Sequence, residues 1–171
     1  MNNIPLAERM RPRRIEDLLG QNNLLNKGGL LTGMIQRGTL PSMILWGPPG
    51  CGKTTLAKLL ATSTNQPFHP LSAVDAGVKE VRNVIEQSHG LFKPLLFLDE
   101  IHRFNKAQQD ALLGAVEQGR ITLIGATTEN PSFSLNPALL SRCQLMVLEP
   151  LSPDDLLQLA RRALDQDPVL S

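Results

Sequence analysis

Residues 43–55 decide the fold of this chain, and their sequence is MILWGPPGCGKTT. The first four residues are apolar and predict a short buried strand. The turn that follows fits the pattern G-x-x-x-x-G-K-[ST] from Gly47 to Thr54, and residues 53–64 predict a helix. A strand, this turn and a helix, in this order, are the context in which the pattern forms a phosphate-binding loop. We therefore expect a phosphate-bearing ligand where the strand ends.

The chemistry of the turn explains why phosphate is the expected ligand. Glycine lets the backbone curl so that several N–H groups point at phosphate oxygens, and the dipole of the following helix adds positive potential. We expect Lys53 to reach the β- and γ-phosphates and the hydroxyl of Thr54 to ligate Mg²⁺. The alternative is a glycine- and proline-rich turn with a structural role alone. The predicted nucleotide-binding residues are Gly47, Pro48, Pro49, Gly50, Cys51, Gly52, Lys53, Thr54 and Thr55.

A second motif places two acids at the end of an apolar run. Residues 95–100 have the sequence LLFLDE, which predicts a buried strand that carries Asp99 and Glu100 at its carboxyl end. We expect Asp99 to hold the Mg²⁺ shell and Glu100 to polarise the attacking water as general base. The alternative is a strand that ends in solvated charge. The second acid favours hydrolysis, because a small-molecule kinase needs no activated water.

Two later segments carry candidate groups for the terminal phosphate. Residues 121–130, ITLIGATTEN, predict a strand that ends in hydroxyls, and we expect Thr128 to hydrogen-bond the γ-phosphate or the lytic water. Arg142 directly precedes the last predicted strand, and we expect it to act as an arginine finger in a neighbouring subunit's site. The alternatives are a turn-forming pair of threonines and an ordinary surface arginine.

The chain as a whole alternates short apolar runs with segments of helical periodicity, which predicts an α/β fold. Near-continuous apolar strands separated by helices favour a parallel sheet covered on both faces, with ligands beyond the carboxyl ends of the strands. Asn105 and Gln108 have the spacing of a capping box, and Gly119 is the expected end of that helix. The predicted strands are 43–46, 68–71, 95–98, 121–125 and 144–148, and the predicted helices are 53–64, 78–88 with its stop at Gly90, and 105–118.

A last helix is expected to begin after Ser152. Ser152 and Pro153 have the character of an N-cap and a first helical residue, and two aspartates follow in the first turn. Because a single amphipathic helix cannot bury its own face, we expect this chain to be a fragment of a longer protein. The residues expected to face inward are Leu156, Leu157, Leu159, Ala160, Ala163 and Leu164.

Length and composition predict one soluble domain of the reducing cytosol, with or without the start of a second domain. Apolar residues make up 42% of the 171 residues and charged residues 19%, which is an ordinary globular balance. The net charge of +1 means that any contact with nucleic acid is a local patch or lies in a part of the protein outside these residues. Cys51 and Cys143 form no CxxC pair, so no zinc site is expected, and no signal peptide or membrane span is evident.

Some polar residues near these motifs are expected to have no catalytic role. His102 is expected to position its loop or face a neighbour, and His69 to be an interior or edge residue of a strand. Four arginines, Arg9, Arg11, Arg13 and Arg14, form a basic cluster. This cluster is either a DNA contact or a solvated segment beside the nucleotide.

Taken in order, these motifs resemble those of AAA+ ATPases, closest to the clamp-loader clade. More specific strings resemble the replication-associated recombination protein A family, which is related to the Werner helicase-interacting protein of eukaryotes. The resemblance extends from Pro5 to about Leu151. The strings are PLAERMRP (5–12), LPSMILWGPPG (40–50), GVKEVR (77–82), DEIHRFNKAQQD (99–110) and IGATTENPSFSLNPALLSR (124–142).

The resemblance implies a P-loop NTPase of AAA+ type, a three-layer sandwich with a five-stranded, mainly parallel sheet and helices on both faces. It implies an adenine-contacting segment at 1–22, a nucleotide-binding core at 23–150 and the start of a truncated helical lid at 151–171. It places Thr128 at the first sensor and Arg142 at the trans finger. The implied adenine contacts are Arg11, Pro12, Leu19 and Gly20.

The resemblance also implies partners and a biological setting. It implies Mg²⁺-dependent hydrolysis of ATP that is stimulated by DNA and drives remodelling or loading at replication forks and gaps. The implied partners are single-stranded or fork-like DNA, further copies in a ring-like homo-oligomer, and single-strand-binding protein, with no membrane. The implied location is the bacterial cytoplasm, in association with the nucleoid. The alternatives are a nucleotide-gated scaffold with little turnover, a clamp-loader subunit and a P-loop phosphotransferase.

Two positions depart from the family pattern. Cys51 stands where the family usually has Thr, and Cys143 where Ala is more usual. Position 51 lies in the variable part of the loop and still offers its backbone N–H, so we expect catalysis to survive. The family's second sensor arginine and its oligomerisation region lie beyond the residues of this chain.

Overall fold

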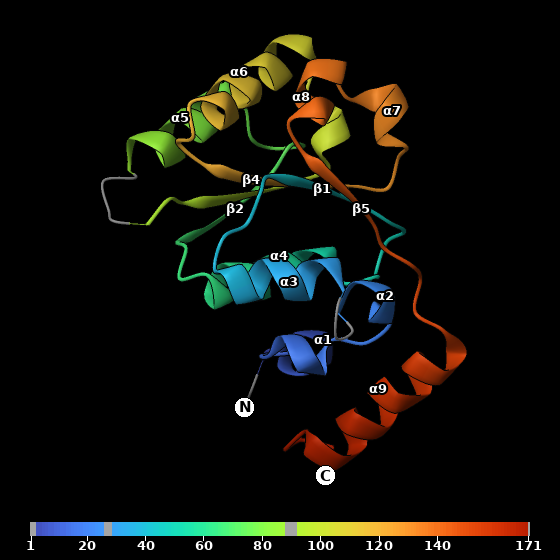
Figure 1. The fold of residues 1–171 in the computed structure, drawn as a ribbon. Helices are drawn as coiled ribbons and strands as arrows, with labels where there is room; N and C mark the ends of the chain where they lie inside the picture. The colour runs from blue at the N-terminus through green and yellow to red at the C-terminus, as the bar shows by residue number, and fades with distance from the viewer. Residues whose placement is uncertain (1–2, 26–28, 88–91, 171) are drawn as a thin grey trace.

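The computed structural model describes residues 3–25, 29–87 and 92–170 and shows a five-stranded sheet between two layers of helices (Figure 1). The strand order is β2-β3-β4-β1-β5, and every pairing is parallel. All five predicted strands are confirmed, with ends that differ by at most two residues. The strands are β1 (Met43–Trp46), β2 (Phe68–Ser72), β3 (Leu95–Asp99), β4 (Thr122–Thr127) and β5 (Gln144–Val147).

The parallel arrangement gathers the ends of the strands at common edges. Trp46, the last residue of β1, is in register with Thr127 at the end of β4, and Leu98 of β3 is in register with Gly125. The segments that follow β1, β3 and β4 therefore leave the sheet at the same edge. This is the edge at which ligands bind in open α/β sheets.

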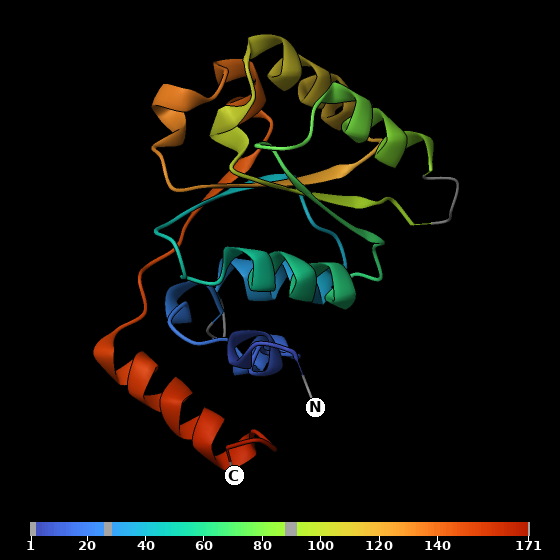
Figure 2. The same ribbon diagram turned by 180° about the vertical axis from the view of Figure 1, so that it is seen from behind.

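Helices cover both faces of the sheet (Figures 1 and 2). Side chains alternate between faces along a strand, so Met43 and Leu45 pack with Leu56 and Leu60 of one core, while Ile44 belongs to the other. Both faces are buried, which is why the strands are almost wholly apolar. One layer holds α3 (Leu30–Arg37) and α4 (Lys53–Ser63), and the other holds α5 (Val78–Glu86), α6 (Lys106–Glu117), α7 (Pro131–Ser134) and α8 (Pro137–Ser141).

Local sequence signals fix the ends of α6. Asn105 accepts a hydrogen bond from the backbone N–H of Gln108, whose side chain accepts one from the N–H of Asn105, so the predicted capping box is confirmed. Gly119, with a φ of +66°, follows the helix. For α5, the predicted end at Gly90 lies outside the described residues.

The N-terminal segment and the last helix lie beyond the α3–α4 layer. The segment contains α1 (Leu6–Arg9), the 3₁₀ turn η1 (Ile15–Asp17) and α2 (Asn22–Leu25), and the last helix is α9 (Pro153–Gln166). Ser152 caps α9 in a capping box with Asp155, and Pro153 is its first residue, as predicted.

The expectation that α9 buries its apolar face is wrong. Leu156, Leu157 and Leu164 are 52%, 51% and 60% exposed, Ala160 is exposed, Leu159 is half-buried and Ala163 is buried. The physical reason is geometric, because α9 stands apart from the sheet (Figure 2). Hydrogen bonds from Arg162 to the Asp17 carbonyl and from Arg9 to Asp167 join it to the N-terminal segment. Within the described part of the chain, every helix is too short or too polar to cross a bilayer.

One bidentate ion pair ties the end of α9 to the N-terminal segment. The Arg9 Nε lies 2.6 Å from Asp167 Oδ2, and its Nη2 lies 3.2 Å from Oδ1. The Asp167 side chain is fully buried and also accepts hydrogen bonds from the N–H groups of Val169 and Leu170. The hydrogen bond from Arg9 is the main cause that lowers the pKa of Asp167 below its ordinary value of 3.8.

This ion pair predicts an acid-sensitive docking of α9. Because the folded-state pKa of Asp167 is depressed, its stabilisation is fully present above the ordinary carboxyl pKa and is lost as pH falls through the folded value. Asp167→Asn should therefore lower the midpoint of urea unfolding at pH 7, and the difference from wild type should shrink on acidification towards pH ~3. Asp165→Asn, the same charge change on the exposed side of α9, is the control. A difference independent of pH would contradict the assignment.

Candidate active site

The loop between β1 and α4 adopts a tight curl that only glycine permits at several positions. Gly50 and Gly52 have φ angles of +75° and +93°, in the left-handed region that other residues rarely adopt. A Cβ on Gly47 would lie 2.9 Å from the carbonyl oxygen of Leu148 and 2.8 Å from Cys51 Sγ. The loop thus packs directly against the chain that follows β5, and its shape is set by the sequence pattern.

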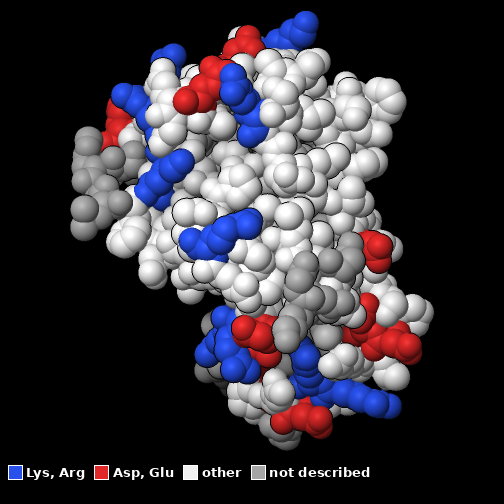
Figure 3. Space-filling model, viewed as in Figure 1, with Lys and Arg blue, Asp and Glu red and all other residues white. Residues whose placement is uncertain are grey.

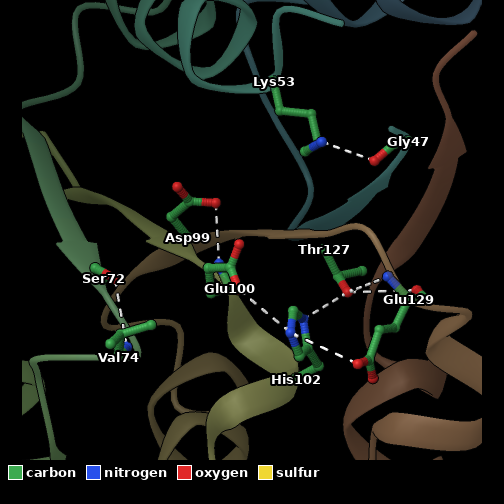
Figure 4. Close-up of polar contacts among 9 residues, drawn as sticks. All are labelled: Gly47, Lys53, Ser72, Val74, Asp99, Glu100, His102, Thr127 and Glu129. Carbon is green, nitrogen blue, oxygen red and sulfur yellow. Dashed lines mark hydrogen bonds and ion pairs between the residues drawn. The ribbon is translucent and has the colours of Figure 1, made fainter. Parts of the chain in front are cut away.

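Lys53 begins α4 and turns its ammonium group back into the loop. Its Nζ donates to the carbonyl oxygen of Gly47 at 2.7 Å (Figure 4). It also donates to the carbonyl oxygen of Pro48 at 2.8 Å and lies 3.8 Å from Cys51 Sγ. The residue is buried, so these hydrogen bonds offset the cost of removing a cation from water. A positive charge is thereby fixed beside the curl, where the sequence predicts phosphate.

A pocket of about 570 Å³ opens between the loop, the N-terminal segment and α9. This volume is in the range of small-molecule sites. Three of the four predicted adenine contacts, Arg11, Pro12 and Leu19, line the pocket beside Gly50, Cys51, Gly52 and Thr55. Gly20 is not among the lining residues. It has a φ of +85°, and a Cβ there would lie 2.6 Å from Leu151 Cδ2.

Gln21 is a structural residue of this region that the sequence analysis missed. Its amide nitrogen donates to the carbonyl of Glu149 at 2.8 Å and to that of Cys51 at 3.4 Å, and its oxygen accepts from the N–H of Glu149 at 3.1 Å. It is almost fully buried. One amide therefore joins the N-terminal segment, the loop and the chain leading to α9. A lone Gln with distant backbone partners leaves no local signal in the sequence.

Asp99 and Glu100 stand at the carboxyl end of β3, as the sequence predicts for their position. Asp99 Oδ1 accepts a hydrogen bond of 2.9 Å from the backbone N–H of Glu100. Glu100 has φ +56° and ψ +39°, a left-handed conformation that costs a non-glycine residue roughly 1–2 kcal/mol. Strain of this kind gathers at functional sites, where the surrounding structure over-determines it. Because of this turn, the carboxylates of Asp99 and Glu100 point in different directions (Figure 4).

The donor set fits Mg²⁺ bound jointly with a phosphate. Across residues 3–25, 29–87 and 92–170, no group of three or more His, Cys, Asp or Glu side chains forms a metal cage. Mg²⁺ needs no such cage, because in phosphate sites it takes one or two protein oxygens together with substrate oxygens and water. Among the described residues, no hydrogen bond involves the Thr54 hydroxyl, and the hydrogen bond to the Asp99 carboxylate engages only one of its two oxygens.

His102, in the 3₁₀ turn η2 (Ile101–Arg103), lies at the centre of a polar cluster beside these acids (Figure 4). Its Nδ1 is 2.9 Å from Thr127 Oγ1, and its Nε2 is 3.3 Å from Glu100 Oε2 and 3.9 Å from Glu129 Oε1. Thr127 is buried, whereas Thr128, the predicted sensor, follows β4 and is exposed. The sequence predicts that His102 positions its loop or faces a neighbour, and it gives no signal that singles out Thr127.

Arg142 lies at the opposite edge of the sheet from the loop. It follows α8, and two residues later β5 begins, where Gln144 is in register with Met43 at the amino end of β1. The parallel strands separate it from its own chain's loop by roughly 13 Å, the length of a four-residue strand. Its guanidinium is exposed and lies 3.2 Å from Glu117 Oε1.

The residue after Arg142 is Cys143. Burial raises the pKa of its thiol to about 11, which makes this thiol unreactive at neutral pH.

Comparison with known proteins places this geometry among nucleotide hydrolases. The chain is 50% identical over 170 residues to ATPase WRNIP1 of Dictyostelium discoideum, covering 97% of this chain and 19% of that protein. It is 55% identical over 163 residues to replication-associated recombination protein A of Coxiella burnetii, covering 94% of this chain and 37% of that protein. The chain thus spans about a fifth of the length of the first relative and about two fifths of the length of the second.

A solved structure with the same fold is the Thermotoga maritima RuvB Holliday junction branch migration motor. The match has a TM-score of 0.74 and 34% sequence identity, and it covers 91% of this chain and 54% of that one. The model of the ATPase family associated with various cellular activities matches residues 43–151, which run from β1 through the end of β5. Because this match extends over well more than half of the 171 residues, the chain belongs to the AAA family of ATPases.

Proposed function

We propose that this chain is the ATP-hydrolysing core of a DNA-linked AAA+ enzyme that acts in replication-associated recombination and repair. The observation that carries the proposal is the shared edge of the sheet. The phosphate loop with its buried Lys53 and the strand end that presents Asp99 and Glu100 both lie at this edge. A charged loop for phosphate and two acids beside it are the groups that nucleotide hydrolysis requires.

The proposed nucleotide contacts follow from the pocket and the loop. The N–H groups of residues 47–55 and the ammonium of Lys53 bind the phosphates, while Arg11, Pro12 and Leu19 surround the adenine in the adjoining pocket. Gly20 supports this wall through its close packing on Leu151. Thr54 and Asp99 would hold Mg²⁺, which when bound neutralises charge on the phosphate oxygens.

In the proposed reaction, water attacks the γ-phosphorus and the bond to the β,γ-bridging oxygen breaks, which gives ADP and phosphate. Glu100 accepts the proton of the attacking water as general base. Lys53 stabilises the charge that develops on the leaving phosphate oxygens. Thr128 lies where β4 ends at the same edge, so its hydroxyl is suited to contact the γ-phosphate or the water.

Arg142 is proposed to complete the site of a neighbouring copy. Its position at the amino edge of the sheet keeps it from the nucleotide of its own chain. Its pairing with Glu117 is solvent-exposed, and exposed ion pairs contribute only about 0–1 kcal/mol, so little opposes its release. This arrangement supports a homo-oligomer in which each arginine stabilises the transition state next door.

The proposed DNA link rests on the relatives, whose names refer to replication-associated recombination and to branch migration at Holliday junctions. We infer single-stranded or fork-like DNA as the polymer that is bound or remodelled, with single-strand-binding protein as a further partner, in the bacterial cytoplasm. On the face drawn in Figure 3, basic side chains stand beside acidic ones. With a net charge of +1, this distribution favours a local DNA contact over a broad basic surface.

We also propose a functional division of the chain. Residues 1–22 form the adenine-side segment, residues 23–150 the nucleotide-binding core, and residues 151–171 the start of a helical lid. The exposed leucines of α9 support the last assignment, since a lid of further helices would cover them.

The role of Glu100 predicts a separation of binding from hydrolysis. In the intact protein, Glu100→Gln should leave the affinity for ATP near that of wild type and lower kcat by about 10²- to 10⁴-fold, the usual worth of a general base. Glu86→Gln, an exposed change at the end of α5, is the matched control. Binding and phosphate release measured on the same preparation test this, and unchanged turnover in Glu100→Gln would reject Glu100 as the base.

The trans role of Arg142 predicts complementation between two inactive variants. Arg142→Ala and Lys53→Ala should each lower kcat by about 10³-fold or more. In a 1:1 mixture with random assembly, roughly a quarter of interfaces join an intact loop to an intact arginine, so ATPase activity should partly return. Arg120→Ala, another exposed arginine, should behave as wild type. Inactive mixtures that form mixed oligomers by mass measurement would refute the trans assignment.

A further inference from the structure

A buried imidazole links two strand ends of the site, and the hydrolysis steps above do not use it. The His102 side chain is only 7% exposed, although the neighbouring Glu100 side chain, two residues earlier, is 37% exposed. Its two ring nitrogens face different elements. Nδ1 faces Thr127 at the end of β4, and Nε2 faces Glu100 at the end of β3.

The hydrogen-bond partners of Thr127 indicate which ring nitrogen carries the proton. Thr127 Oγ1 accepts from the N–H of Glu129 at 3.0 Å, and its single hydrogen has two acceptors within reach. These are His102 Nδ1 at 2.9 Å and the carbonyl of Glu129 at 3.3 Å. The nearer acceptor is Nδ1, and when the hydroxyl donates to it the neutral ring carries its hydrogen on Nε2.

The charges around Nε2 favour the same tautomer independently. The groups that face it are the carboxylates of Glu100 and Glu129, at 3.3 and 3.9 Å. Two acceptors facing an unprotonated nitrogen would repel its lone pair, whereas an N–H there binds them. The resulting chain runs from the Glu129 N–H through the Thr127 hydroxyl and the His102 ring to Glu100 Oε2.

We propose that His102 is a positioning residue for Glu100, and that it makes the orientation of this carboxylate depend on the turn formed by residues 127–129. One oxygen of Glu100 is held by Nε2–H, which leaves the other free to take the proton of water. This hydrogen bond matters because the Glu100 backbone is in a strained left-handed conformation and its side chain is 37% exposed. Without the hydrogen bond, the side chain samples other rotamers. This inference rests on the proposed role of Glu100 as base.

The coupling also gives the Thr127–Glu129 turn a function. Glu129 directly precedes the cap of α7, where Asn130 accepts from the N–H of Ser132, and α7 carries the almost fully exposed Phe133. Any movement of this turn displaces the hydroxyl that holds the imidazole. His102 thus joins the turn that follows β4 to the reactive end of β3.

A double-mutant cycle in the intact protein tests the proposal. His102→Ala should lower kcat by about 10- to 100-fold, the scale for a misplaced group, with little change in KM or ATP affinity. In the Glu100→Gln background the same change should alter kcat by less than about 3-fold, because the group that His102 orients is already disabled. His102→Gln, which keeps an N–H donor of similar reach, should recover part of the loss.

The outcomes separate this proposal from the proposed function. If His102→Ala lowers kcat by the same factor in both backgrounds, His102 acts independently of Glu100 and the proposal is overturned. General destabilisation would also give equal factors, so a folding defect cannot imitate support. If Glu100→Gln alone leaves kcat unchanged, the proposed role of Glu100 as general base is rejected, and this outcome is distinct from a failure of the His102 proposal.

The Thr127 hydroxyl can be tested separately. Thr127→Ser, which keeps the hydroxyl, should retain kcat, whereas Thr127→Val should lower kcat as much as His102→Ala does. Equal kcat in the two Thr127 variants would show that Thr127 does not take part in the chain of contacts.

Discussion

The site is organised around one buried cation, the ammonium of Lys53. Removing this charge from water is costly unless hydrogen bonds replace hydration, and the carbonyls of Gly47 and Pro48 provide them. Carbonyls that turn towards Lys53 require the curl that the glycines permit. The same curl brings the loop against Leu148 and Gln21, so contacts join the charge, the loop and the segment after β5.

Parallel strand pairing turns this local unit into a reaction site. Because β1, β3 and β4 run in one direction, the loop, the two acids and the threonines reach a common edge. Arg142 lies at the other edge by the same rule, away from the loop of its own chain. The polar cluster at His102 spans two strand ends, so the site is a property of the sheet and not of a single motif. The N-terminal segment and α9, joined through Arg9 and Asp167, line the pocket beside the loop.

The fold was predictable where the signal is local. Apolar runs marked all five strands, and the caps at Asn105 and Ser152 marked two helix starts, because each depends on neighbouring residues. Features with distant partners were not predictable. Gln21 binds carbonyls far along the chain, and the exposure of α9 depends on what lies beside it. The sequence predicts that β4 ends at Gly125 and favours Thr128 as the polar residue of the site. The strand instead continues through Thr127, whose side chain points inward and contacts His102.

Nucleotide binding itself is the most direct test of the account. The chain has a single tryptophan, Trp46, which immediately precedes the loop and reports its environment by fluorescence. Titration with ATP and Mg²⁺ should give a saturable change, weakened by at least about 10-fold in Lys53→Ala, since loss of a charge-assisted contact costs roughly 1.5–3 kcal/mol. Equal affinity in wild type and Lys53→Ala would contradict the claim that this buried ammonium holds the phosphates.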